Sequence, residues 1–309
     1  LTIPLVFLIL IDLWTVDRRY LNSDSFVSKT YLENNFVPSE ADNYILKDND
    51  PDYRVLNLAR NVFNDGFTSY FHKSIGGYHA AKLRRYQDMI DGPLSADIGR
   101  LQNMLQQRMP IDFVFMNLPI LNMLNCKYVI YNPDSPPLLN NYRLGNAWFV
   151  KEIKWVNTPD EEYEAVSDSF NPRNTAIIDK KWENNMIDYV GFSFDSIATI
   201  KLISYKPHEL IYESSSKSKQ VAVFSEIFYE KGWNAYIDGK LVPHGRANYI
   251  LRTMVVPAGN HKIKFKFEPK VYTQSQNIAK IGSLIIILLI IIVIVIEVKE
   301  SYKKDELNS

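Results

Sequence analysis

The residues best suited to chemistry gather in the segment between Tyr70 and Arg85. Two adjacent glycines, Gly76 and Gly77, precede a stretch with helical character, and backbone N–H groups in such a place can hold a phosphate. Side chains that can assist by charge or by stacking on a sugar lie around the pair: Tyr70, His72, Lys73, Tyr78, His79, Arg84 and Arg85. The segment is therefore our candidate substrate-binding surface. The plainer alternative is a tight glycine loop followed by an exposed arginine-rich helix face.

Other reactive groups are weaker candidates. His72 and His79 are seven residues apart, and the glycines between them disfavour the single helix that would align them, so we expect no metal there. Trp233 and Tyr236 can form a sugar-stacking platform, although an aromatic residue at the start of a strand more often packs in a core. Cys126 is the only cysteine and sits in an apolar stretch, which predicts a packed thiol. The sequence contains no Walker loop, dinucleotide fingerprint or nucleophile elbow.

The composition argues against nucleic acid as a partner. Lys and Arg together number 35, as do Asp and Glu, so the chain has no overall basic field. The length of 309 residues allows about two domains.

The most apolar stretch, residues 278–296, predicts a transmembrane helix. It has no charge after Lys280. A helix needs about 20 apolar residues to cross the hydrocarbon layer, and a lysine near its end can reach the interface. A buried core helix is the alternative, but it would need protein on all sides. Residues 1–16 are also apolar and unlike a signal sequence, so we expect them to be the end of an earlier transmembrane helix.

The region between these spans predicts an α+β fold. Residues 17–145 mix helices and strands, which favours a small α/β unit. Residues 146–275 contain short alternating strands about ten residues apart, a pattern typical of an antiparallel β-sandwich. The expected elements before residue 146 are a helix at 26–34, a loop to 52, a strand at 53–58, helices at 80–88 and 95–107, helical turns near 118–125 and a strand at 127–131. Transmembrane helices flank the whole, and residues 297–309 form a tail.

Turns and a lysine row add detail to the second region. After a strand at 147–156, a helix at 160–167 and a strand at 175–179, the pairs Asp238–Gly239 and Pro257–Asn260 predict two hairpins. On the last strand, apolar residues alternate with three lysines, Lys262, Lys264 and Lys266. This row indicates a solvated sheet face or a protected sheet edge. A contact with lipid headgroups is the alternative.

Several strings resemble the YfhO family of bacterial membrane proteins. They are residues 69–79 (SYFHKSIGGYH), 83–87 (LRRYQ), 121–130 (LNMLNCKYVI), 224–240 (FSEIFYEKGWNAYIDGK) and 256–265 (VPAGNHKIKF). The resemblance implies a large multi-pass protein of the bacterial plasma membrane, related to the GT-C glycosyltransferases, which take a sugar from a polyprenyl-phosphate carrier on the outer side of that membrane. It also implies that residues 17–277 are extracytoplasmic and that residues 297–309 are cytoplasmic.

The resemblance places the reacting group outside these residues. Enzymes of this kind carry their catalytic acid in the first extracytoplasmic loop, which we do not find in this sequence, so we assign no catalytic residue, metal or cofactor. The expected partners are membrane lipid, a polyprenyl-phosphate-linked sugar and a cell-envelope glycan or polymer as acceptor. Two alternatives stay open: a non-catalytic, membrane-anchored module that binds glycan or protein during envelope assembly, and a purely architectural support for the membrane part.

Overall fold

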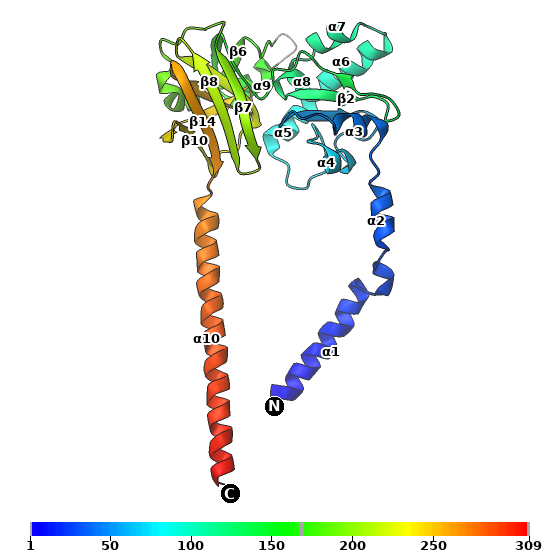
Figure 1. Ribbon diagram of the computed structural model, residues 1–309, viewed down its shortest axis with the longest axis vertical. Coiled ribbons are helices and arrows are strands. Elements are labelled where there is room, and N and C mark those ends of the chain that lie inside the picture. The colour runs from blue at the N-terminus through cyan, green and yellow to red at the C-terminus, as the bar shows by residue number, and fades with distance from the viewer. Residues whose placement is uncertain (1, 167–169, 308–309) are drawn as a thin grey trace. The chain divides into compact units, whose positions relative to one another are not determined.

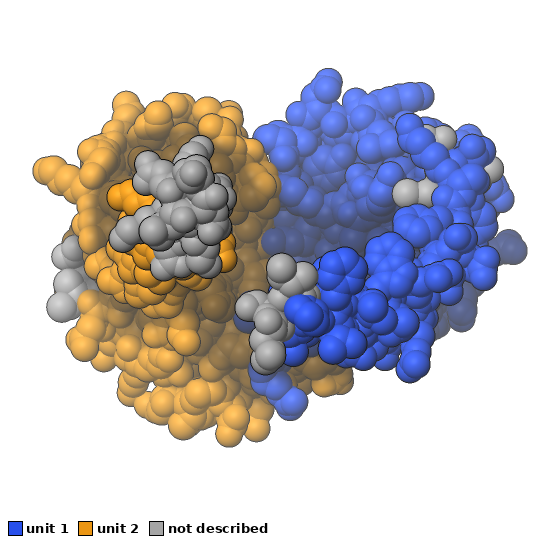
Figure 2. Space-filling view, turned by 90° about the horizontal axis from the view of Figure 1, so that it is seen from below, with its two compact units in different colours: residues 1–84, 97–143 blue, residues 85–96, 144–309 orange. Residues whose placement is uncertain are grey.

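The computed structural model describes residues 2–166 and 170–307 and mixes helices with sheets (Figure 1). It divides into two compact units (Figure 2): unit 1 comprises residues 1–84 and 97–143, and unit 2 comprises residues 85–96 and 144–309. The predicted α+β class with antiparallel sheets is confirmed. Parts of three sequence predictions, Leu1, Ser167 and the last two residues of the tail, lie outside the described residues.

Unit 1 is built on a three-stranded sheet of order β1-β2-β3. β1 (Arg54–Asn57) runs parallel to β2 (Cys126–Ile130), which pairs antiparallel with β3 (Leu138–Leu139). Parallel neighbours need a long connection, and the helices between β1 and β2 supply it. All five residues of β2 are buried, including Lys127. The strands expected near residues 53–58 and 127–131 are thus confirmed.

The helices of the first half differ from the prediction at several places, two of which have a clear local cause. The expected loop contains α3, because Ser39 and Asp42 form a capping box that starts a helix there. The helix expected from Ala80 begins only at Arg84, since the Ala81 N–H donates to His79 Nδ1 in a turn that competes with helix. The bounds are α1 (Thr2–Tyr20), a 3₁₀ turn (Ser23–Ser25), α2 (Lys29–Asn35), α3 (Glu40–Ile45), α4 (Phe67–Phe71), α5 (Arg84–Met89), a π-helical turn (Ile90–Leu94), α6 (Ser95–Gln106), α7 (Ile111–Met116) and α8 (Pro119–Met123).

Unit 2 contains two antiparallel sheets, of order β11-β10-β14-β8-β7 and β12-β13-β9-β4. Side chains from both sheets form one hydrophobic core, in which Tyr212, Phe224 and Phe265 pack edge to face. The bounds are β4 (Ala147–Phe149), β7 (Thr199–Lys206), β8 (Glu209–Ser216), β9 (Gln220–Ile227), β10 (Trp233–Ile237), β11 (Lys240–Val242), β12 (Gly245–Ala247), β13 (Leu251–Val256) and β14 (Gly259–Phe267).

The strand expected at 147–156 is in fact two strands. β4 joins the four-stranded sheet, whereas β5 (Glu152–Val156) pairs with β6 (Thr175–Asp179) in a separate two-stranded sheet. That pair is parallel, because α9 (Pro159–Ala165) connects the two strands as a crossover. The 3₁₀ segment Lys180–Tyr189 follows β6. Residues 175–179 therefore do not belong to either large antiparallel sheet.

One of the two expected hairpins is present. Asp238 and Gly239 have φ values of 50° and 82° and join β10 to β11, which is the geometry that a two-residue hairpin requires. The prediction for Pro257–Asn260 is wrong, because β13 and β14 lie in different sheets and these residues carry the chain from one sheet to the other. β14 lies inside its sheet, with Ile263 and Phe265 buried, so its lysine row belongs to an outer sheet face and not to an edge.

α10 (Lys270–Leu307) follows β14 after only two residues. Among the helices of the described chain, its segment Lys270–Lys299 is the one long and apolar enough to cross a membrane, and none of its most apolar window is buried. A buried core helix does not fit this exposure. α1 also exposes apolar side chains, from Leu5 to Val16, but it does not meet the same criterion, so its assignment to a membrane stays a prediction.

Candidate functional site

A pocket of about 190 Å³ in unit 1 adjoins two of the residues selected from the sequence, His72 and Lys73. The other side of the pocket is formed by the loop between α3 and β1, which contributes three aspartates. The full lining is Ile45, Leu46, Asp48, Asp50, Pro51, Asp52, Tyr53, Phe71, His72 and Lys73.

His72 is held by a buried carboxylate. Its Nε2 lies 2.9 Å from Oδ1 of Asp42, and the two side chains are 3% and 1% exposed. The second oxygen of Asp42 accepts hydrogen bonds from the backbone N–H and the hydroxyl of Ser39, at 2.9 and 2.7 Å. Burial lowers the pKa of His72, although the hydrogen bond to Asp42 acts in the opposite direction. The ring is therefore neutral at neutral pH, with the proton on Nε2.

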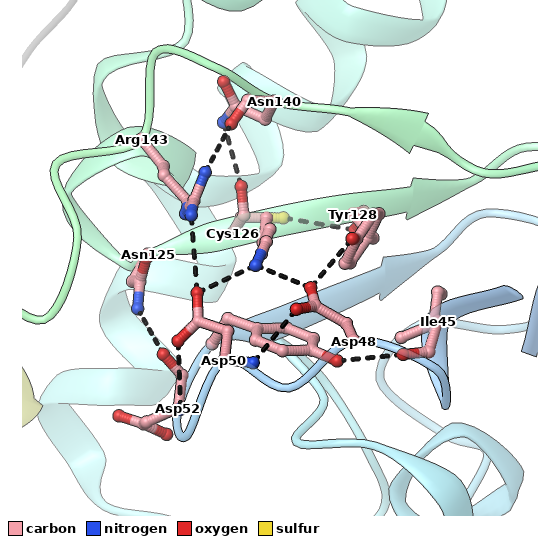
Figure 3. Close-up of polar contacts among 11 residues, drawn as sticks. Ile45, Asp48, Asp50, Asp52, Asn125, Cys126, Tyr128, Asn140 and Arg143 are labelled. Carbon is pink, nitrogen blue, oxygen red and sulfur yellow. Dashed lines mark hydrogen bonds and ion pairs between the residues drawn. The ribbon is translucent and has the colours of Figure 1, made fainter.

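The aspartates of the loop are each paired with a cation. Lys73 forms an ion pair with Asp52. Lys127 Nζ lies 2.5 Å from Asp48 and 2.8 Å from Asp50 (Figure 3). Tyr128 donates its hydroxyl proton to Asp48 at 2.8 Å. Burial raises the pKa of Asp48, but the hydrogen bonds from Lys127, the Asp50 N–H and Tyr128 outweigh it and lower the pKa below its usual range.

This network ties the loop to the central strand. Lys127 and Tyr128 belong to β2, and Arg143 reaches Asp50 from beyond β3 at 3.4 Å. Burial raises the pKa of Tyr53 to about 12, which keeps its hydroxyl protonated. Within the part of the chain that the structure describes, no group of three or more His, Cys, Asp or Glu side chains is arranged to hold a metal ion. The arrangement stabilises the fold by joining this loop to β2.

The glycine pair makes a close backbone approach. A Cβ atom on Gly76 would lie 1.8 Å from the carbonyl oxygen of Val62, so only glycine fits there. Gly77 has a φ of 106° and donates its N–H to that same oxygen at 2.7 Å, while Gly76 donates its N–H to the Ser74 hydroxyl at 3.0 Å. Both N–H groups proposed to hold a phosphate are thus bonded within the protein in this structure.

The two arginines differ in their surroundings. Arg85 belongs to unit 2, where its Nη1 lies 3.3 Å from Oε2 of the buried Glu162 and its guanidinium lies 4.3 Å from the ring centroid of Tyr249. Glu162 also accepts a hydrogen bond from Arg246 at 2.8 Å. Arg84 is exposed, at the start of α5.

Several of the selected residues have exposed side chains. Tyr70 and Tyr78 are 63% and 72% exposed, and His79 and Arg84 are exposed as well. They all belong to unit 1. The exposed side chains among the selected residues therefore lie near the end of α4, in the loop that follows and at the start of α5.

Of the remaining candidates, Trp233 and Cys126 pack in a core and Tyr236 does not. Trp233 packs against the core of unit 2 and lies 4.0 Å from the Arg252 guanidinium, whereas Tyr236 donates to Glu268 at 2.6 Å on the other face of β10. The two rings thus do not form one platform. Cys126 is buried, and burial raises the pKa of its thiol to about 12, which confirms the packed thiol.

Sequence reasoning missed the acidic partners of the site. Asp48 and Asp50 lie in a segment predicted only as a polar loop, and the sequence suggested no role for Asp42 or Asp52. Their spacing of two was the available signal, since carboxylates at such a spacing in a loop can converge on cations from neighbouring strands. Nothing in the local sequence pairs them with Lys127, which lies 77 residues after Asp50.

The comparisons with known proteins agree with the resemblance found in the sequence. A family model described as "Bacterial membrane protein YfhO" matches residues 195–279, from the approach to β7 to the first turns of α10. No curated protein and no solved structure matches the chain. The matched segment contains two of the strings noted above, 224–240 and 256–265. Over residues 195–279, this chain is therefore similar to the YfhO family of bacterial membrane proteins.

Proposed function

We propose that this chain is the membrane-anchored C-terminal part of a lipid-linked-sugar-dependent glycosyltransferase. In this role, the α/β unit and the β-sandwich formed by the two antiparallel sheets lie on the extracytoplasmic side, between the membrane crossings at residues 1–16 and 278–296. The enzyme takes a sugar from a polyprenyl-phosphate carrier and transfers it to a cell-envelope glycan or polymer. The reacting carboxylate belongs to another part of the protein.

The observation that carries the proposal is the exposed apolar surface of α10. The large apolar side chains from Ile281 to Ile296 are between 46% and 60% exposed. Exposing so much apolar surface to water is unfavourable, and the hydrocarbon layer removes the cost. Because two residues separate β14 from α10, the sheet that contains β14 must stay near the bilayer surface, where a lipid-borne substrate would be presented.

The exposed side chains after α4 suit the substrate. A cation such as Arg84 can stabilise the phosphate that leaves the sugar, and exposed rings such as Tyr78 can stack on a sugar face. His72, Lys73 and Arg85 act indirectly in this proposal, because each is engaged by a carboxylate.

Substitutions in the full-length protein test the substrate surface. We expect Tyr78→Ala combined with Arg84→Ala to reduce the envelope glycan made by the cell while the amount of membrane-inserted protein stays normal. Tyr131→Ala is the matched control, because this tyrosine is 53% exposed in the same unit and lies outside the loop. If the double variant makes the same amount of envelope glycan as the native protein, Tyr78 and Arg84 do not take part in sugar transfer.

The single cysteine permits a direct test of orientation. Cys126 is buried with a raised pKa, so a membrane-impermeant maleimide should leave the native protein unlabelled. We expect a cysteine at the exposed Lys240 to be labelled from outside intact cells, and a cysteine at Lys299, at the far end of the membrane segment, to be labelled only after permeabilisation. The reverse pattern would place the two sheets in the cytoplasm.

A second candidate is a non-catalytic module that binds glycan during envelope assembly. It is favoured by one observation: three of the selected polar side chains, His72, Lys73 and Arg85, already form ion pairs or hydrogen bonds with carboxylates. The two functions separate when the acid expected in the first extracytoplasmic loop of the full-length protein is replaced. Sugar transfer stops if the protein is the enzyme, and it continues if the protein is only a binding module.

A further inference from the structure

Two open grooves of unit 2 meet at the start of β7. The first, of about 390 Å³, is lined by residues of β4 and β7, the contacting edge strands of the two large sheets, and by the loops next to them. The second, of about 480 Å³, extends over β7, β8 and the start of β14. Thr199 and Lys201 line both grooves. A ligand made of linked units can therefore occupy the two grooves together.

The first groove combines a core residue with an exposed ring. Phe149 is 8% exposed and belongs to the hydrophobic core between the sheets, and it lines the groove from that side. Phe194 lines it from the loop before β7 and is 39% exposed. Lys151 Nζ lies 5.6 Å from the centroid of the Phe194 ring. An exposed ring of this kind can stack on the apolar face of a sugar, with a cation held beside it.

Hydrogen bonds fix the two loops that border the first groove. Trp148 Nε1 donates to the carbonyl oxygen of Pro172 at 2.8 Å, which holds the loop before β6 against β4. The carboxylate of Asp195 accepts the backbone N–H of Ile197 at 3.1 Å and that of Lys217 at 2.8 Å. These two bonds hold the loop before β7 and lower the pKa of Asp195. Because the loops are already ordered, a ligand does not bear the entropic cost of ordering them.

Two lysines give the first groove its charge. Lys151 and Lys201 have exposed side chains, and among the described residues neither forms an ion pair with a carboxylate. Glu213 lies opposite Lys201 in the register of β7 and β8, but the two side chains are not within ion-pair distance. The acidic residue of the lining is Asp195, whose two oxygens already accept N–H groups. The groove therefore favours a negatively charged group beside the Phe194 ring.

The second groove is lined mainly by polar side chains. Thr199 and Ser215 lie opposite each other on β7 and β8, and Asn260 adds an amide from β14. All three side chains are exposed. Hydroxyl and amide groups both donate and accept hydrogen bonds, as the hydroxyl groups of a sugar require.

The edge of the sheet does not suit a peptide. β7 is an edge strand, and an extended peptide could pair with it only where its backbone is regular. The register with β8 shifts between Leu202 and Ser204, and such an irregularity interrupts further pairing. The small polar side chains of the second groove and this broken edge together favour a saccharide over a polypeptide as the occupant.

We propose that the two grooves bind a negatively charged oligosaccharide, with one sugar ring on Phe194, its acidic substituent between Lys151 and Lys201, and the neighbouring sugar over Thr199 and Ser215. The acidic substituent is a carboxylate or a phosphate, since both accept hydrogen bonds from lysine. This proposal rests on the proposed function in one respect, the expectation that unit 2 faces the glycans of the cell envelope. It adds a site and a charge for the glycan that is bound.

Saturation-transfer NMR on the purified full-length protein in detergent tests the site. The probe is trigalacturonate, a three-sugar acid, and its methyl ester is the matched neutral sugar. Succinate serves as an acid without a sugar ring. The test variant is Lys151→Gln with Lys201→Gln, and the matched control is Lys231→Gln with Lys240→Gln, which removes two exposed lysines of unit 2 that line neither groove.

We expect trigalacturonate to bind the native protein more tightly than its ester and than succinate. Loss of two exposed charge contacts in Lys151→Gln with Lys201→Gln should raise the Kd for trigalacturonate roughly tenfold, and the control variant should leave it unchanged. High salt should weaken the acid but not the ester. Phe194→Ala should weaken both sugars and leave succinate unaffected.

Three results would overturn the proposal: equal affinity for the acid and its ester, an unchanged Kd in Lys151→Gln with Lys201→Gln, or no binding of either sugar. Succinate that binds as tightly as trigalacturonate would show a site for any dicarboxylate and would overturn the saccharide. Binding by the purified protein neither needs nor reports sugar transfer. The grooves can therefore fail while envelope glycan still depends on Tyr78 and Arg84, and the glycosyltransferase proposal can fail while the grooves bind the probe.

Discussion

Nε2 of His72 lies 2.9 Å from Oδ1 of Asp42, in a part of unit 1 where both side chains are almost completely buried. The pair joins the end of α4 to α3, since His72 follows the last residue of α4 and Asp42 lies in the first turn of α3. The same carboxylate takes part in the capping box of α3. The buried side chain of Asp42 thus helps to start α3 and also holds His72, the residue that follows α4.

We expect this pair to make the protein less stable in mild acid. Burial lowers the pKa of His72 from the ordinary value of 6.5, so the unfolded chain takes up the proton first as the pH falls. The stabilisation by the neutral ring is complete above the unfolded pKa and is lost as the pH falls through the lower folded pKa. His72→Asn, which keeps a donor for Asp42, should flatten this loss in thermal unfolding measured by circular dichroism in detergent. The exposed His79→Asn is the control, and equal slopes for His72→Asn and the native protein would contradict the prediction.

His261 on β14 should behave in the opposite way. Its Nδ1 lies 2.7 Å from Asp238 and its Nε2 lies 3.0 Å from the Ala258 carbonyl oxygen, so two acceptors require both nitrogens to carry a proton. The hydrogen bond to Asp238 raises the pKa of His261. This stabilisation is complete below pH 6.5, the ordinary pKa of histidine in the unfolded chain. It is lost as the pH rises through the higher pKa of the folded protein. His261→Gln should therefore lower the melting temperature at acidic pH and converge with the native protein at alkaline pH; a constant difference would refute this.

Local sequence predicted the elements that depend on their own residues. The apolar run of β2, the Asp238–Gly239 turn and the exposed apolar surface of α10 each follow from periodicity or turn chemistry within one segment. The resemblance to the YfhO family was indicated by strings of residues, and a model of that family matches residues 195–279. These features need no knowledge of distant partners.

Features that depend on distant partners could not be predicted. Nothing near Arg85 indicates Glu162, which lies 77 residues later, and an arginine on a helix face is ordinarily solvated. The Pro257–Asn260 turn looks like a hairpin locally, but the flanking strands find better partners in separate sheets: β13 pairs with β9, and β14 pairs with β8 and β10. Tertiary packing decides which strands pair and which distant side chains meet, and the local sequence of one chain does not show these partners.

Gly76→Ala and Gly99→Ala form a matched test of the glycine loop. A Cβ on Gly76 would lie 1.8 Å from the Val62 carbonyl oxygen, whereas a Cβ on Gly99, exposed in α6, would meet nothing within 4 Å. We expect Gly76→Ala to destabilise the protein because backbone must move, and Gly99→Ala to stabilise it by up to about 1 kcal/mol because alanine favours helix. Melting temperatures of the two variants provide the measurement. A neutral Gly76→Ala would show that the loop is not held against Val62.

The strongest effect should come from Glu162, which is fully buried and accepts hydrogen bonds from Arg85, Arg246 and the Tyr249 N–H. Arg246 is only 6% exposed on its side chain, so Glu162→Ala leaves a buried cation with reduced compensation and should cost about 3–5 kcal/mol. Arg85 is 29% exposed, so Arg85→Ala should cost less, about 1–2 kcal/mol, because water can replace its contact. Denaturant unfolding of both single variants and of the double variant measures the coupling. If Arg85→Ala costs as much as Glu162→Ala, Arg246 is not the cation that requires the carboxylate.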